Sequence, residues 1–267
     1  MKRKIVAICI FGLLAATGCM AERTGNLGAE PDSEINKQEA SEVNAPKTIK
    51  LVGIGDSLTK GIGDESGHGG YFGMVKDKIE EQDHIKEVSV KNFGVKGHKT
   101  SNLQAKLQEE AVIKSVEEAD IILMTIGGND IMNVVRSNIF SLDFEPFRTE
   151  QKNYEKRLKD VFTTIRHHNS NAYIVFIGLY NPFQSMLPEL PEINTIINEW
   201  NVNTKQMINK DDKAIFVSVD QLFSNDHDER LFYKDEFHPN EKGYSLIAGE
   251  VFKAIKEIDF ERFNNEK

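Results

Sequence analysis

The stretch LVGIGDSLT, residues 51–59, joins an apolar run to a polar turn, and the rest of the chain is arranged around it. The apolar, β-prone run from Ile49 to Ile54 predicts a strand, and Gly55-Asp56-Ser57 predicts a tight turn before a helix. A serine at such a turn lies at the carboxyl edge of a sheet and faces backbone N–H groups, which is where open α/β sheets carry their chemistry. Ser57 is therefore a candidate nucleophile.

Apolar runs and longer amphipathic stretches alternate along the rest of the chain. Further strands are predicted at 88–93, 121–126, 173–179 and 214–219. Helices are predicted at 71–81, 101–116, 150–167, 193–208 and 239–258, and residues 131–147 form a short apolar-rich segment. Five apolar strands separated by helices predict a parallel sheet with right-handed crossovers and helices on both faces.

The first residues predict export rather than fold. Lys2-Arg3-Lys4, followed by an apolar run from Ile5 to Ala16, is typical of a secretory signal peptide covering residues 1–18. The small residues before Cys19 resemble the lipobox of bacterial lipoproteins, although Ala16 stands where that motif more often has Leu. The resemblance implies a lipid, such as a palmitoyl chain, on the Cys19 sulfur. An ordinary cleaved signal peptide that contains a Cys is the alternative.

The domain is expected to begin after a linker. Residues 19–47 are rich in Glu, Asn, Gly, Ser and Lys and predict a flexible tether, so residues 48–267 form one α/β domain. The cysteines of the sequence are Cys9 and Cys19, and both precede the predicted domain. The domain is therefore expected to have neither a disulfide nor a thiolate metal site.

Net charge narrows the class of partner. The formal charge is −9, and cleavage of the signal would remove three positive charges and leave −12. Such acidity opposes binding to phosphates, so we expect no nucleic-acid partner and no basic patch for anionic lipid headgroups.

Two later residues are candidate partners for Ser57. His238 precedes a helix that Pro239 is expected to start, so its ring projects from a loop. Asp235 is placed to fold back on the imidazole and hold its tautomer. In isolation, a helix-capping His238 and a solvated Asp235 would be the simpler interpretation, but their occurrence with Ser57 and Asn129 favours catalysis.

Gly97 and Asn129 are candidate oxyanion donors. Gly97 offers a backbone N–H in the turn after the second predicted strand, and Asn129 offers a side-chain amide after the third. With the Ser57 N–H they would give three donors. Gly94, in the same turn, is an alternative to Gly97, and each residue alone is more often a structural turn or cap residue.

Other site chemistries fit less well. A dinucleotide-binding glycine loop would need Gly where Leu58 stands, and the Gly-Lys-Ser/Thr ending of a phosphate loop is absent. The pair His167-His168 lacks a carboxylate or Cys at a metal-binding spacing and is interpreted as solvated.

Four segments in order resemble the blocks of the GDSL, or SGNH, hydrolase family: GDSL at 55–58, NFGVKG at 92–97, GGND at 127–130 and DEFH at 235–238. The resemblance spans about 48–258. It implies a three-layer α/β/α sandwich with a flavodoxin-like five-stranded parallel sheet, and a serine esterase or lipase that forms an acyl-enzyme. It also implies Ser57 as nucleophile, His238 as base, Asp235 as its orienting partner, and Gly97 and Asn129 as oxyanion donors, with no metal or cofactor.

With the lipobox, the chain resembles a lipoprotein-type acylhydrolase, expected as a monomer anchored to the outer face of a bacterial cell membrane. Its expected substrate is a lysophospholipid or short acyl ester, with an O-acetyl group on cell-wall polysaccharide second. A non-catalytic surface binding lipoprotein is the alternative from another class. Six apolar residues that follow the third and fourth predicted strands are candidates for an acyl pocket at the Ser57 edge, and a minor core under the loops is the alternative interpretation: Phe140, Leu142, Phe144, Phe183, Met186 and Leu187.

Overall fold

The structure is a computed structural model that describes residues 47–138, 143–182, 192–224 and 231–258. The chain separates into two units, Met1–Glu42 and Val43–Lys267, and every described residue belongs to the second. The predicted signal peptide, Cys19 and the predicted tether up to residue 46 lie outside the described residues and remain predictions.

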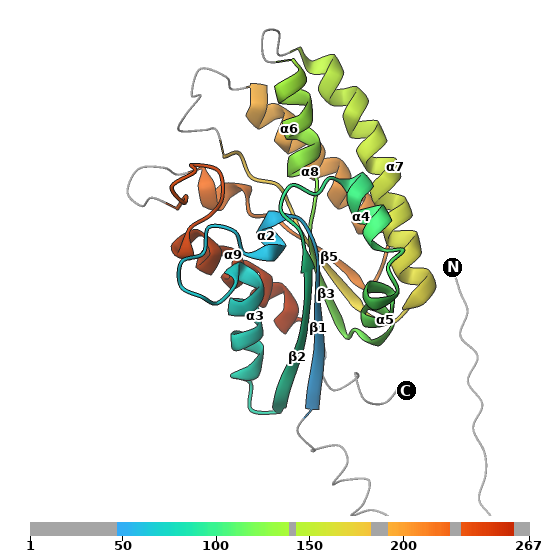
Figure 1. The fold of residues 1–267 in the computed structure, drawn as a ribbon, viewed down its shortest axis with the longest axis vertical. Coiled ribbons are helices and arrows are strands. Elements are labelled where there is room, and N and C mark those ends of the chain that lie inside the picture. The colour runs from blue at the N-terminus through green and yellow to red at the C-terminus, as the bar shows by residue number, and fades with distance from the viewer. Residues whose placement is uncertain (1–46, 139–142, 183–191, 225–230, 259–267) are drawn as a thin grey trace, which may run out of the picture. The chain divides into compact units, whose positions relative to one another are not determined.

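Five parallel strands form one sheet in the order β2-β1-β3-β4-β5 (Figure 1). They are β1 (Lys47–Gly55), β2 (Ile85–Gly94), β3 (Ile121–Thr125), β4 (Tyr173–Ile177) and β5 (Ala214–Val217). Every residue of β3 is buried, as expected for a central strand covered on both faces. The predicted five-stranded parallel sheet is confirmed.

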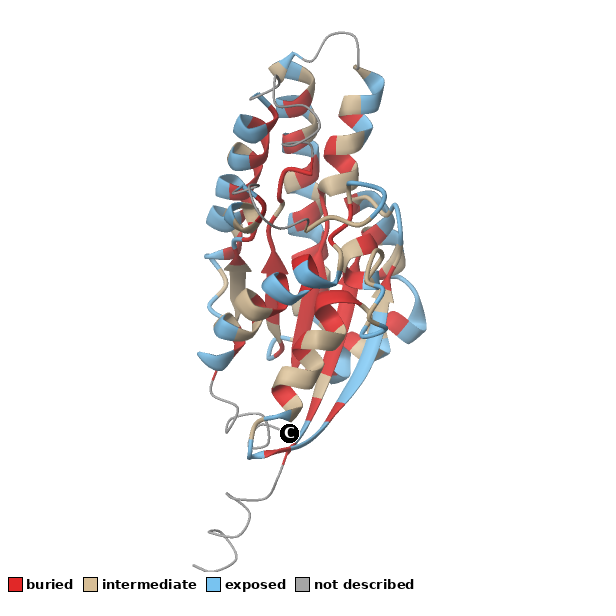
Figure 2. Cartoon of the chain, turned by 90° about the vertical axis from the view of Figure 1, so that its left-hand side faces the viewer, coloured by how far each residue is buried: buried red, intermediate tan, exposed pale blue. Residues whose placement is uncertain are grey.

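Helices cover both faces of the sheet and enclose two separate hydrophobic cores (Figures 1 and 2). One face carries α3 (Gly70–Glu80) and α9 (Glu241–Lys256), with the 3₁₀ turn η1 (Asp220–Phe223). The other carries α4 (Thr100–Lys106), α5 (Glu110–Glu118), α6 (Gly128–Ser137), α7 (Phe144–His168) and α8 (Glu192–Ile208). The three-layer sandwich is thus confirmed. None of these described helices is long and apolar enough to cross a membrane.

The single helix predicted at 101–116 is wrong, because the chain forms α4 and α5 with a break between them. Leu107 and Val112 are both buried, but their spacing of five residues exceeds the three or four that keep side chains on one helix face. A turn at 107–109 restores the phase, so that Val112 packs inward and Ala111 is exposed.

Three further helices differ from the prediction, one of them α7, which begins at Phe144 rather than near residue 150. Residues 128–137 form α6, where only an apolar-rich segment was expected. Helix α9 begins at Glu241 rather than at Pro239, because the Asn240 side chain caps it by accepting from the Gly243 N–H at 3.1 Å. Pro239 instead pairs with Phe232 in an isolated antiparallel bridge.

The sheet order reverses at β1, which lies between β2 and β3, so a crevice is expected beyond the carboxyl ends of β1 and β3. Gly55 ends β1 at φ 135°, and a Cβ there would lie 2.0 Å from the Thr125 carbonyl oxygen. Only glycine therefore allows the two strand ends to approach this closely. The Asp56 N–H donates to the same oxygen at 3.0 Å, which fixes the turn that presents Ser57.

Candidate active site

The structure brings Ser57, His238 and Asp235 into one hydrogen-bonded chain. Ser57 is the first residue of α2 (Ser57–Lys60), the short helix that follows β1. Its Oγ lies 2.8 Å from His238 Nε2, and His238 Nδ1 lies 2.6 Å from an Asp235 carboxylate oxygen. Ser57 and His238 are both buried. In this arrangement the imidazole can accept the serine proton while the carboxylate holds the opposite ring nitrogen protonated.

Asp235 is held as a carboxylate by its surroundings. Burial raises its pKa, but the backbone N–H groups of His238 and Phe237, at 3.0 and 3.1 Å, and the imidazole of His238 outweigh that effect. The net result is a pKa below the usual aspartate value, because each of these contacts favours the charged form. Asp235 therefore stays ionised under conditions in which an ordinary aspartate begins to protonate.

The loop that carries His238 is fixed to the rest of the domain at several points. The Tyr233 N–H donates to the His238 carbonyl at 2.7 Å, across the narrow hairpin that also pairs Phe232 with Pro239. The Tyr180 hydroxyl, just beyond β4, donates to the Phe237 carbonyl at 2.8 Å. Tyr180 was not among the residues predicted for the site, because the sequence shows it only as a tyrosine at the end of an apolar run.

The candidate oxyanion donors line one depression of about 350 Å³ together with Ser57 and His238. Gly97 has a φ of 84°, a backbone conformation that favours glycine, and no acceptor for its N–H is recorded among the described residues. The Ser57 N–H lies in the first turn of α2, where backbone donors have no intrahelical partner. Both groups are thus available to a ligand in the depression.

Gly94 has a different role from Gly97. Its N–H donates to the Asn92 side chain at 2.9 Å, and a Cβ would lie 2.5 Å from the Lys60 backbone nitrogen. Gly94 therefore allows the end of β2 to approach α2, with its own donor already used. Of the two glycines, the geometry favours Gly97 as the candidate oxyanion donor.

Asn129 is oriented by the turn that carries Gly97. Its Nδ2 donates to the His98 carbonyl at 2.9 Å, and the residue lines the depression at Ser57. A side-chain amide has two N–H donors, so the second remains for a ligand.

Hydrogen bonds around a largely buried ion pair connect the same turn, through Thr100 of α4, to Asp130 of α6 and Arg157 of α7. Asp130, with 1% of its side chain exposed, accepts from the Thr100 hydroxyl at 2.6 Å and from Arg157 Nη2 at 3.0 Å. Arg157 Nε also donates to the Thr100 hydroxyl at 2.7 Å. We call Thr100, Asp130 and Arg157 the clamp. Sequence analysis missed it, although Asp130 stands next to Asn129 in GGND.

Asp56, also missed, is a buried acid beside the nucleophile. Its Oδ1 accepts from the Thr125 hydroxyl at 2.7 Å and from the Leu58 N–H at 3.0 Å. Burial raises the pKa of Asp56 to about 7, against the opposing effect of these hydrogen bonds. The folded protein thus favours the neutral acid more than the unfolded chain does.

Replacing Asp56 by Asn is expected to remove part of the pH dependence of stability. Because the folded pKa is raised from 3.8 to about 7, the contribution of Asp56 is fully present below the lower value and is lost as pH rises through the higher one. Wild type should therefore lose on the order of 4 kcal/mol of unfolding free energy through Asp56 between about pH 4 and pH 7, and the variant should not show this loss. Chemical denaturation across that range measures the difference, and parallel pH profiles would contradict it.

A narrow apolar cavity of about 50 Å³ adjoins Ser57 on another side. Its apolar lining comes from α2, β3, α6, β4, α8 and their loops: Leu58, Ile126, Ile131, Met132, Ile177, Leu179, Tyr180, Ile193, Ile197 and Phe237. Of the six residues predicted to form an acyl pocket, only Phe144 lies in the described part of the chain. For Phe144 the alternative of a core position holds, because it lines neither cavity at Ser57 and its ring packs against the core and under Arg148 at 5.3 Å.

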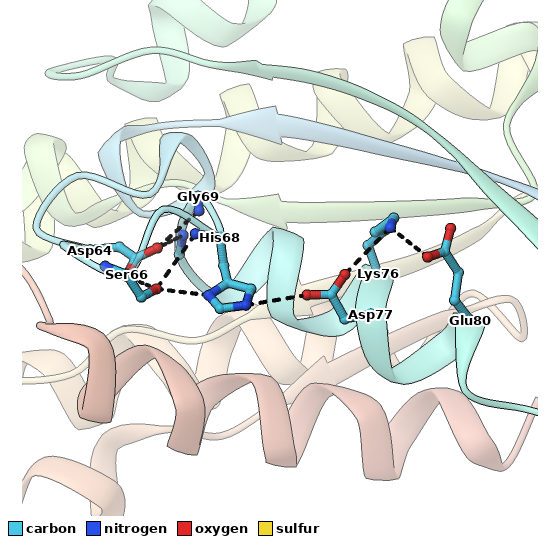
Figure 3. Close-up of polar contacts among 8 residues, drawn as sticks. Asp64, Ser66, His68, Gly69, Lys76, Asp77 and Glu80 are labelled. Atoms are coloured by element: carbon cyan, nitrogen blue, oxygen red, sulfur yellow. Dashed lines mark hydrogen bonds and ion pairs between the residues drawn. The ribbon is translucent and has the colours of Figure 1, made fainter.

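Figure 3 shows a second place where a serine, a histidine and aspartates meet, in and after the loop that precedes α3. Ser66 Oγ lies 2.9 Å from His68 Nδ1, and His68 Nε2 lies 3.6 Å from Asp77. Asp64 binds the Ser66 hydroxyl and the N–H groups of Gly69 and Gly70, and so organises the loop. Neither cavity at Ser57 reaches these residues. They lack the oxyanion donors that surround Ser57, which makes Ser66 a matched control.

No metal chemistry is indicated by the part of the chain that the structure describes. No group of three or more His, Cys, Asp or Glu side chains in these ranges is arranged to hold a metal ion.

Comparison with known proteins agrees with this geometry. The model of the GDSL-like lipase/acylhydrolase family matches residues 54–246. The chain is 40% identical to the Bacillus subtilis protein YpmR, which is named as uncharacterized, over 96% of this chain and 97% of that protein. It is 29% identical to the spore germination lipase LipC of Bacillus licheniformis, over 78% of this chain and 96% of LipC.

A solved structure extends the likeness to three dimensions. The lipase Lip_vut3 from a goat rumen metagenome aligns with a TM-score of 0.70 at 26% identity, covering 77% of this chain and 97% of that one. Together with the family match, which covers most of the chain, this shows that the protein belongs to the GDSL-like lipase/acylhydrolase family.

Proposed function

We propose that the protein is a serine ester hydrolase that works through an acyl-enzyme. The observation that carries the proposal is the hydrogen-bonded chain from Ser57 through His238 to Asp235, at the meeting point of two cavities. Membership of the family and similarity to two proteins named as lipases support it.

The geometry supports a two-step reaction. Ser57 Oγ attacks the ester carbonyl while His238 Nε2 takes its proton, and Asp235 stabilises the imidazolium that forms. The N–H groups of Ser57 and Gly97 and the Asn129 amide hold the developing oxyanion. The leaving alcohol then takes the proton from His238. A water molecule, activated by the same imidazole, releases the acid and regenerates Ser57.

The apolar cavity supports a short acyl group, or the first carbons of a longer chain, on the acid side of the ester, because its volume is about 50 Å³. Its aliphatic walls and small volume suit a hydrocarbon chain better than a sugar or a charged group. A lysophospholipid or a short acyl ester is the leading substrate class, and an O-acetyl group on wall polysaccharide is the second candidate because the small volume also accommodates acetyl.

Export and a lipid anchor on Cys19 form part of the same proposal. They are supported by the basic, apolar and small-residue segments at the start of the chain, which resemble a lipoprotein signal. A tethered esterase would work close to the membrane in which a lysophospholipid is found.

Labelling with a fluorophosphonate probe tests the proposal directly. The probe reacts with serine hydroxyls activated by a neighbouring base, so we expect stoichiometric modification of Ser57, detected by mass spectrometry of the intact protein and its peptides. The Ser57→Ala variant should lose the label. Ser66→Ala should keep it, since Ser66 has a histidine neighbour but lies in neither cavity. An unlabelled folded protein would favour the non-catalytic binding role instead.

A further inference from the structure

The depression beside Ser57 is basic, in a chain whose net charge is −9. Three cationic side chains line it, Lys96, Lys99 and Arg136, and no Asp or Glu is among the described residues that do so. Lys96 and Arg136 are exposed, and no carboxylate in the described part of the chain forms an ion pair with any of the three. The expectation from sequence that an acidic chain has no basic patch was wrong at this site, because net charge does not report local arrangement.

The three cations come from the two segments that also carry the candidate oxyanion donors. Lys96 and Lys99 flank the turn at Gly97, while Arg136 follows Asn129 by seven residues on α6. Seven residues are about two helical turns, so Arg136 lies on the same face as Asn129 and about 10 Å further along the helix. The positive charge therefore extends outward from the reacting carbonyl.

The two cavities divide the ester between them. Ser57, Asn129, Met132 and Phe237 line both, so a substrate carbonyl at Ser57 has the apolar cavity on one side and the basic depression on the other. An acyl chain gains from apolar burial and gains nothing from three cations, so it belongs in the apolar cavity. The alcohol half of the ester then lies in the basic depression.

On the basis of the esterase function proposed above, we propose that Lys96, Lys99 and Arg136 form a binding site for a phosphate group on the alcohol half of the substrate, such as that of a monoacyl glycerophospholipid. Arginine and lysine bind phosphate oxygens by charge-assisted hydrogen bonds, and an anion bound between like charges relieves their mutual repulsion. Hydrolysis consumes one water and yields the fatty acid and the phosphate-bearing alcohol. The apolar lining of the acyl cavity favours the hydrocarbon chain of a lipid, and the cavity volume of about 50 Å³ holds only the first carbons of that chain.

The test compares two esters that differ only in the phosphate, 1-octanoylglycerol 3-phosphate and 1-octanoylglycerol, below their aggregation limits. We expect wild type to prefer the phosphate ester by about tenfold or more in kcat/KM, mainly through KM. The triple variant Lys96→Gln, Lys99→Gln, Arg136→Gln should bring this ratio close to one. Raising NaCl from about 0.05 to 0.5 M should lower the ratio in wild type, because salt screens exposed charges.

A matched triple variant controls for the change in net charge. Lys86→Gln, Lys205→Gln and Lys210→Gln remove three exposed lysines near the opposite, amino-terminal edge of the sheet and should leave the ratio unchanged. Equal rates on both esters by an active wild type, or a preference that survives the first triple variant, would overturn the phosphate proposal and leave the esterase intact. A phosphate preference seen with acetyl but not octanoyl esters would overturn the lipid assignment. No hydrolysis together with no fluorophosphonate labelling would instead mean that the esterase proposal itself has failed.

Discussion

Replacement of Ser57 by Ala is expected to lower kcat for p-nitrophenyl butyrate by about 10⁴- to 10⁶-fold, the range typical when the nucleophile of a serine hydrolase is removed. Without the hydroxyl, His238 has no proton to accept and no acyl-enzyme forms. The fold should persist, since the side chain of Ser57 hydrogen-bonds to His238 and the truncation removes one heavy atom. Steady-state kinetics and thermal unfolding measure the two effects on the same preparation.

Two further variants make the result specific. The double variant Ser57→Ala, His238→Ala should be no worse than Ser57→Ala, because residues that act as one unit are strongly non-additive. Ser66→Ala should retain wild-type turnover, although its hydroxyl also lies within hydrogen-bond distance of a histidine. Substantial activity in a folded Ser57→Ala protein would exclude Ser57 as the nucleophile.

The sheet could be predicted because its signals are local, whereas the pairing of Ser57 with His238, 181 positions away, followed from the resemblance of both segments to the family's blocks. Each strand is a short apolar run, and a parallel sheet collects the ends of such runs at one edge whatever their separation in sequence. Helix α6 gave a weaker signal, since its buried apolar positions are only Ile131 and Val134 and no side chain caps its start. A helix with so few inward residues is hard to distinguish from an apolar loop.

The remaining parts of the site depend on contacts between distant residues. Asp56 meets Thr125 across 69 positions, and Arg157 meets Thr100 across 57. The sequence around each residue does not reveal its partner, because an acid that is buried in the fold and an acid that is exposed to solvent look the same in sequence. The basic depression could not be predicted for the same reason. Lys96 and Arg136 are 40 positions apart in sequence and line one depression only in the folded chain. Amino-acid composition and net charge are averages over the whole chain, so they do not reveal these local arrangements.

Removal of the clamp carboxylate by Asp130→Ala is expected to cost about 1–3 kcal/mol in unfolding free energy, the usual effect of leaving a buried donor without its partner. Thr100 is fully buried and loses its acceptor, whereas Arg157 keeps its ion pair with Glu150. Chemical denaturation measures the loss. Arg148→Ala on the same helix is the control, because Arg148 pairs with Glu199 at the surface, where an ion pair contributes little to stability.

The clamp also predicts a loss of turnover in variants that still fold. Thr100 follows the turn that carries Gly97, and Asp130 follows Asn129, so the clamp fixes the spacing between the two candidate oxyanion donors. Asp130→Asn keeps an oxygen for the Thr100 hydroxyl but weakens the pairing with Arg157, so kcat should fall while KM changes little, since the donors act chiefly on the transition state. A double-mutant cycle with Arg157→Met should give a coupling of about 0.5–3 kcal/mol in stability. If Asp130→Ala were as mild as Arg148→Ala and left kcat unchanged, the clamp would be neither a structural nor a positioning element.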